Sequence, residues 1–177
     1  MGARDEYKIA AIALADVLVN NDLELVYGGA SVGIMGVIAD RVLQQGGNVH
    51  GVIPESLAVK EIAHTALTKL HIVASMHERK TMMANLSDGF IAMPGGFGTL
   101  EELIEILTWS QLRFHDKPVG LLNVRNYFQH LLLYLDHAME EGFLRPENHA
   151  MLLHDADPVA LLRKFEEYEA PQVDKWA

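Results

Sequence analysis

Short apolar segments alternate with helical segments along almost the whole chain, and this alternation constrains the fold more than any other feature. Strands are predicted over the apolar segments 23–27, 48–53, 70–74, 89–93 and 119–124. Near-helical spacing of apolar residues predicts helices over 5–19, 34–44, 100–114 and 127–141, one from Met76, and a last one after Pro158. Apolar strands joined by helices are typical of a parallel sheet covered on both faces. We therefore predict a doubly wound α/β fold.

The length and the composition predict one compact domain. The chain has 177 residues, of which 50% are hydrophobic and 21% are charged, so it can bury enough apolar surface to fold. We expect a single domain over residues 1–170, followed by a C-terminal tail over 171–177. The N-terminus lacks the apolar run of a signal peptide, and no segment approaches the ~18 apolar residues of a membrane span. We therefore predict a cytoplasmic protein that does not act on membranes.

The charge and the missing residue types exclude several classes of function. A formal net charge of −10 argues against a nucleic-acid binder, which needs clustered Lys and Arg. The chain has no Cys, which excludes disulfides and thiol catalysis, and its nine His form no HExxH motif or close pair. There is no GxSxG elbow, and the acidic residue that dinucleotide-binding folds use is missing at about twenty residues after either glycine-rich loop. We predict no metal and no cofactor.

Two glycine-rich loops connect a strand to a helix, which is where doubly wound sheets bind ligands. The first contains Gly28, Gly29 and Gly33, and its glycines fit either phosphate binding at a helix N-terminus or a tight turn. The second is Pro94-Gly-Gly-Phe-Gly-Thr99, which opens the helix that contains Glu101 and Glu102. The second loop is the sharper signal for a site.

The helix after the second loop has two candidate roles for Glu102. Thr99 and Glu102 have the spacing of a capping box, whereas a carboxylate beside a glycine loop also suits a cleft. A helical wheel predicts a core face of Leu100, Leu103, Ile104 and Leu107. Ile106 and Trp109 lie on the other side with Glu102, which favours a subunit contact there.

The segment Ser75-Met-His-Glu-Arg-Lys80 is the third feature. Ser75 and Glu78 again have capping-box spacing. Arg79 falls on the apolar side of its helix, where a guanidinium needs an anionic partner. That partner is either a carboxylate such as Glu102 or Glu61, or the phosphate of a ligand, and Lys80 adds a second positive charge.

Together these motifs resemble the LOG ("lonely guy") family of cytokinin riboside 5′-monophosphate phosphoribohydrolases. The segment Pro94 to Glu102 fits the family motif PGGxGTxxE, Met76-His-Glu-Arg-Lys80 precedes it at the usual distance, and the resemblance runs from about Gly2 to Pro158. It implies a Rossmann-like fold and a homodimer or higher homo-oligomer through the face of Ile106 and Trp109. Relatives begin with a further strand, so the first strand of the family is expected to be absent from this chain.

The resemblance also implies an N-glycosidase that hydrolyses an N6-prenylated adenosine 5′-monophosphate to the free base and ribose 5-phosphate. By motif, the catalytic pair is Arg79 and Glu102. The implied substrate-binding residues are Gly28, Gly29, Gly33, Glu61, Met76, Lys80, Gly95, Gly96, Phe97, Gly98, Thr99, Leu100, Glu101 and Thr108. Some relatives carry the label "lysine decarboxylase", but no residue here favours a pyridoxal phosphate enzyme. Two alternatives remain open, a general AMP or purine-nucleotide nucleosidase and a non-catalytic module that binds a nucleotide-type ligand.

Overall fold

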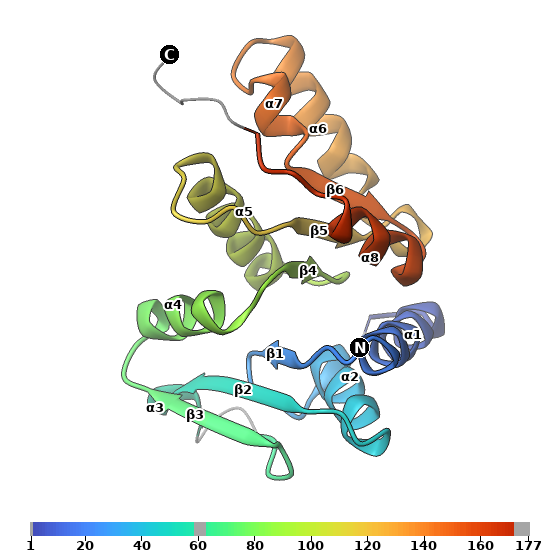
Figure 1. The fold of residues 1–177 in the computed structure, drawn as a ribbon, viewed down its shortest axis with the longest axis vertical. Coiled ribbons are helices and arrows are strands. Elements are labelled where there is room, and N and C mark those ends of the chain that lie inside the picture. Colours follow the sequence, from blue (N-terminus) through green and yellow to red (C-terminus); the bar gives the residue numbers. More distant parts are fainter. Residues whose placement is uncertain (1, 59–62, 172–177) are drawn as a thin grey trace. The chain divides into compact units, whose positions relative to one another are not determined.

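The computed structural model describes residues 2–58 and 63–171 (Figure 1). The chain divides into two compact units, Met1–Ser87 and Asp88–Ala177. Each unit contains a three-stranded parallel sheet with helices packed against it. The prediction of an α/β fold with parallel strands is therefore confirmed, and the strands pair within two separate sheets.

The N-terminal unit has the strand order β1-β2-β3. Its elements are α1 (Asp5–Asn20), β1 (Leu25–Tyr27), α2 (Gly33–Gln44), β2 (Val49–Pro54), α3 (Glu55–Ala58), β3 (Lys69–Val73) and α4 (Met76–Leu86). The central strand β2 is buried along most of its length, which explains its apolar sequence. Helix α1 packs on α2, and both α2 and α4 contact the sheet.

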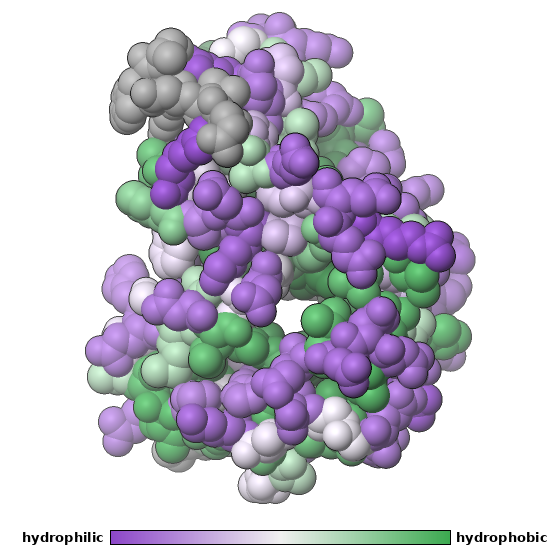
Figure 2. Space-filling model, in the orientation of Figure 1, coloured by the Kyte–Doolittle hydropathy of each residue, from purple (hydrophilic) through white to green (hydrophobic). Residues whose placement is uncertain are grey.

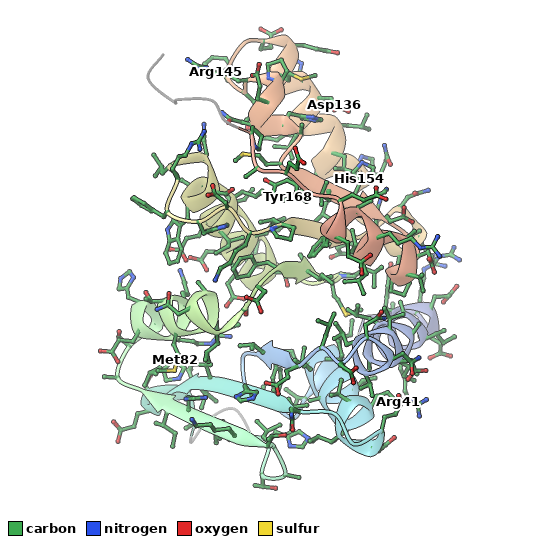
Figure 3. The ribbon with its side chains drawn as sticks, in the orientation of Figure 1. Arg41, Met82, Asp136, Arg145, His154 and Tyr168 are labelled. Carbon is green, nitrogen blue, oxygen red and sulfur yellow. The ribbon has the colours of Figure 1, made fainter. Side chains whose placement is uncertain are left out.

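An ion pair joins the two N-terminal helices. Arg41 on α2 (Figure 3) donates from Nε to Oδ1 of Asp16 at 2.6 Å and from Nη2 to Oδ2 at 3.2 Å. The Gln45 amide donates to the same carboxylate at 2.7 Å. The hydrogen bond from Arg41 is the main reason that the pKa of Asp16 lies below its ordinary value.

The C-terminal unit has the strand order β4-β5-β6. Its elements are β4 (Phe90–Ala92), α5 (Phe97–Gln111), β5 (Val119–Leu122), the short 3-10 helix η1 (Val124–Asn126), α6 (Gln129–Glu140), α7 (Pro146–His149), β6 (Leu152–Asp155) and α8 (Pro158–Glu166). All four residues of β5 are buried. Helix α8 lies on β5 closely enough that a Cβ at Gly120 would approach Phe165 to 2.6 Å and Leu161 to 3.0 Å.

The sequence predicted most of these elements, with four omissions. Helices α3 and α7, each of four residues, the 3-10 helix η1 and strand β6 were not predicted. Strand β6 has only two apolar residues before His154 and Asp155, and it is only partly buried, so its apolar signal is weak. Helix α5 begins three residues earlier than predicted, at Phe97. No helix within the described ranges is long and apolar enough to cross a membrane. The cytoplasmic location and the domain boundary at residue 170 stay predictions.

Candidate functional site

Helix α4 begins where its capping residues predict. The backbone N–H of Glu78 donates to Oγ of Ser75 at 3.2 Å, and the Glu78 carboxylate accepts from the N–H of Ala74 at 2.8 Å. This is the predicted cap, except that the reciprocal bond reaches Ala74 rather than Ser75. The cap fixes the first turn of α4 and therefore the position of Arg79 one residue later.

The guanidinium of Arg79 lies against the strands of the N-terminal unit. Its Nε–H donates to the backbone carbonyl of Val52 on β2 at 3.1 Å. It also lies so close to Gly28 that a Cβ there would overlap Nη2. Arg79 is partly buried rather than fully enclosed. The structure thus gives this residue a backbone partner that the sequence did not indicate.

Other predicted residues around α4 are partly accessible. Met76, the first residue of α4, is exposed, and Lys80 is half-buried next to Arg79 in the sequence. Both lie in the first two turns of the helix. Glu61, a predicted nucleotide contact, lies outside the described residues.

The first glycine-rich loop is largely enclosed, because Gly28 and Gly29 are buried and Gly33 is half-buried. Gly29 and Gly33 have φ values of 80° and 67°, which favour glycine over residues with a side chain. The carbonyl of Gly29 accepts from the N–H of His64 at 3.0 Å. A Cβ at Gly29 would meet Ile53 and Leu70 at 3.4 Å. These contacts give the loop a packing role inside the protein, while phosphate binding by Gly28, Gly29 and Gly33 stays a prediction.

The second glycine-rich loop enters helix α5 without a side-chain cap. Gly96 is the N-cap residue, so Thr99 is the third residue of the helix, and the predicted capping box of Thr99 with Glu102 is wrong. The Thr99 hydroxyl instead lies over Gly95, where a Cβ would overlap it. The carbonyl of Gly95 accepts from the hydroxyl of Tyr127 at 2.6 Å. Glycine at 95 is therefore required by close packing within this unit.

Gly96 and Gly98 differ from the other glycines of the site. A Cβ at either position would meet no described atom within 4 Å, and neither residue has a positive φ. Between them, Phe97 is 93% exposed. The first turn of a helix presents N–H groups that lack acceptors within the helix and that favour an anion. The start of α5 therefore combines open space with the electrostatics of an anion site.

The remaining predicted residues follow along α5. Leu100 and Glu102 are half-buried and Glu101 is exposed. Thr108 donates from its hydroxyl to the carbonyl of Ile104 at 2.7 Å, one turn earlier in the same helix. Its hydroxyl hydrogen is therefore used within α5.

The packed face of α5 differs from the predicted one. Leu103, Ile106 and Ser110 are buried, whereas Ile104 is 44% exposed. Ile106 was expected at a subunit contact. It is only 9% exposed in the single chain, so it offers little surface for such a contact. Apolar residues occur on nearly every side of this helix, so the pattern could not fix which side faces β5.

The predicted site residues thus form two groups, one in each unit. Arg79 lies with Gly28 and Val52 in the first unit, and the Gly95–Glu102 segment lies with Tyr127 in the second. The sequence reasoning missed Tyr127 and the carbonyl of Val52. The position of Tyr127 in the sequence could have indicated it. Tyr127 follows β5, which pairs with β4, and the loops after adjacent parallel strands lie at the same edge of a sheet. No group of three or more potential metal ligands occurs among residues 2–58 and 63–171.

Comparison with known proteins shows which family the chain belongs to. A family model described as "possible lysine decarboxylase" matches residues 35–165. The chain is 47% identical over 176 residues to cytokinin riboside 5′-monophosphate phosphoribohydrolase LOG1 of Arabidopsis thaliana, covering 99% of this chain and 82% of that protein. The chain belongs to the LOG family. This LOG-family chain is also 48% identical over 174 residues to the probable phosphoribohydrolase LOGL2 of Oryza sativa subsp. japonica, covering 98% of this chain and 71% of that protein.

Solved structures support the fold. A molybdenum cofactor binding protein from Rippkaea orientalis matches with a TM-score of 0.70 and 21% identity, over 93% of this chain and 89% of that one. The molybdenum cofactor carrier protein of Chlamydomonas reinhardtii matches with a TM-score of 0.68 and 20% identity, over 93% and 91%. At this level of identity the similarity concerns the fold alone.

Proposed function

We propose that this LOG-family chain hydrolyses the N-glycosidic bond of an N6-prenylated adenosine 5′-monophosphate, releasing the free base and ribose 5-phosphate. The observation that carries the proposal is the 46–48% identity, over nearly the whole chain, to relatives named for this reaction. The sequence also keeps the motif residues from Met76 to Lys80 and from Pro94 to Glu102.

Glu102 is the proposed catalytic carboxylate. Breaking the bond builds positive charge on C1′ of the ribose, and glycosidases stabilise such a centre with carboxylates. Glu102 lies on α5 shortly after the glycine-rich loop and is half-buried. In the proposed mechanism it stabilises the cation and orients or deprotonates the attacking water.

Arg79 is the proposed partner that holds the anionic substrate. A guanidinium binds phosphate or carboxylate oxygens through charge-assisted hydrogen bonds. The bond from Nε to the Val52 carbonyl supports this role, because it limits the orientations of the planar group.

The start of α5 is the proposed site of the 5′-phosphate. The open space at Gly96 and Gly98 supports this assignment, since no described side chain packs where a Cβ would lie at either position. Backbone N–H groups at the helix start would bind the phosphate oxygens. Binding the phosphate away from the reacting bond positions the ribose, so a nucleoside without phosphate should react poorly.

A homodimer forms part of the proposal. Figure 2 shows hydrophobic residues among hydrophilic ones on the face it presents, and α5 and its flanks carry exposed apolar side chains at Phe97, Ile104 and Phe114. Since Ile106 is buried, we assign the contact to exposed residues such as Ile104. Light scattering should give twice the monomer mass, and Ile104→Glu should shift it toward the monomer.

A product assay tests the reaction directly. The protein is incubated with isopentenyladenosine monophosphate, AMP and adenosine, and the products are separated by chromatography. We expect free base from the prenylated nucleotide and little from adenosine. Base release from neither monophosphate would contradict the hydrolase. Equal or faster release from AMP would favour a general purine-nucleotide nucleosidase, and tight binding without cleavage would favour a binding module.

A further inference from the structure

The contact between Gly28 and Arg79 carries an inference beyond the family motif. Gly28 follows β1 directly, and it is buried. A Cβ at this position would overlap Nη2 of Arg79 and lie 3.3 Å from Cζ. Real Cβ atoms essentially never come so close to another heavy atom, so any side chain here would push the guanidinium away.

Conformation does not explain glycine at this position. Gly28 does not have a positive φ, whereas its neighbour Gly29 has a φ of 80°. A residue with a side chain could therefore adopt the backbone of Gly28 without the strain that it would meet at Gly29. The guanidinium of Arg79 is the described group that requires Gly28 to lack a Cβ.

A hydrogen bond also holds the same guanidinium. Nε–H donates to the carbonyl of Val52 on β2, the strand that pairs with β1. The guanidinium thus has a backbone acceptor on one strand and lies against the glycine at the end of the next. These two contacts limit the positions that the planar group can take.

We propose that Gly28 is a positioning residue that acts through Arg79, and that it does not serve by binding the substrate phosphate itself. The expected effect on rate rests on the proposed function. The effect of Gly28 on the position of the Arg79 guanidinium does not. A displacement of a binding group by about 1 Å can cost roughly 100-fold in rate. Gly28→Ala should therefore lower kcat/KM for the nucleotide by roughly that factor.

A double-mutant cycle separates the two roles of Gly28. If Gly28 acts through Arg79, Gly28→Ala in an Arg79→Ala background should change kcat/KM by less than about twofold. Equal fold losses in both backgrounds would overturn the inference. Gly47→Ala is the matched control, because its Cβ would crowd Val19 and Val42 in the same unit. It should lower thermal stability without the large loss of kcat/KM.

A measurement that needs no activity keeps the inference independent of the reaction. The Nε–H signal of Arg79 in a nitrogen-15 NMR spectrum is assigned by its disappearance in Arg79→Lys. We expect that signal to shift or exchange faster in Gly28→Ala and to stay unchanged in Gly47→Ala. An unchanged signal in Gly28→Ala would overturn the inference even if the enzyme is active. If wild-type protein releases no base, the proposed function fails while this comparison still decides the positioning.

Folding of the variants gives the last readout. Should Gly28→Ala fail to fold, the double variant with Arg79→Ala should fold again, because the overlapping group is gone. A double variant that also fails to fold would show that Gly28 is needed for another reason, and would overturn the inference.

Discussion

Glu102 offers the sharpest prediction at the scale of single residues. Glu102→Gln keeps the size and much of the hydrogen bonding of the side chain but removes its charge, so it should lower kcat by roughly 10²–10⁴-fold. Glu105→Gln, on the same helix, is the matched control and should keep the wild-type rate. Steady-state assays with the prenylated nucleotide measure both. A Glu102→Gln variant with full activity would remove this residue from the mechanism.

Tyr127 supports a second prediction at this scale. Its hydroxyl holds the Gly95 carbonyl at 2.6 Å, and its ring packs edge-on against the buried ring of Phe128 at a centroid distance of 5.0 Å. Tyr127→Phe removes one hydrogen bond, with a net contribution of about 1 kcal/mol, and keeps the ring. We expect KM for the nucleotide to rise roughly fivefold, with kcat changed less.

Tyr134→Phe is the control for the loss of a hydroxyl, since Tyr134 is exposed on α6. It should leave both constants unchanged. A Tyr127→Phe variant with the wild-type KM would mean that the Gly95 carbonyl does not need this bond to hold the loop.

At the scale of elements, Asn123 connects β5 to α6. It is buried, its side-chain carbonyl accepts from the N–H of Phe128 at 2.8 Å, and its own N–H donates to the Asp155 carbonyl at 2.7 Å. Asn123→Ala leaves the buried Phe128 N–H without this acceptor, which should cost about 1–3 kcal/mol of unfolding free energy. Chemical denaturation measures the loss, and Gln129→Ala, at the exposed start of α6, should change it little. Equal stability of the two variants would contradict the connecting role.

Element starts were predictable where a side chain marks them. Ser75 predicted the start of α4 because its hydroxyl caps the helix. The start of α5 was missed because Gly96 supplies no side chain and the helix runs into the glycine-rich loop. Strand β6 was missed because half of its residues are polar. Local chemistry thus sets some boundaries, while others depend on packing that a single sequence does not reveal.

The site shows the same division between local and tertiary information. Motif spacing predicted the residues around Arg79 and Glu102, but the partners of the two segments come from other elements. The Val52 carbonyl and the Tyr127 hydroxyl lie 27 and 32 residues from their partners along the chain. Such contacts depend on the order of strands in each sheet, which the alternation of elements alone does not determine.

At the scale of the whole molecule, His71 should make stability depend on pH. Burial, followed by Lys69 and then His50, lowers the pKa of His71 below its ordinary 6.5. Its ring stacks on that of His50 on the adjacent strand, and His50 in turn pairs with Glu24 at 3.0 Å. Because the folded state binds this proton less readily than the unfolded state, stability is full above pH 6.5 and falls as the pH drops below it.

Denaturation midpoints at pH 7.5 and pH 5.5 measure this effect. His71→Gln cannot take up the proton, so the difference between the two midpoints should shrink. His130→Gln, at an exposed position on α6, should leave the difference as in the wild type. An unchanged difference in His71→Gln would assign the pH dependence to other groups.

The exposed ring of Phe97 has a practical consequence. It stands at the first residue of α5 between two glycines with open space around them, and the chain contains no Cys. A single cysteine placed there would be the sole thiol of this 177-residue chain, so a fluorescent dye could be attached to the chain at that point alone. Such a probe would report the arrival of a nucleotide as a change in emission, before and independently of any bond cleavage.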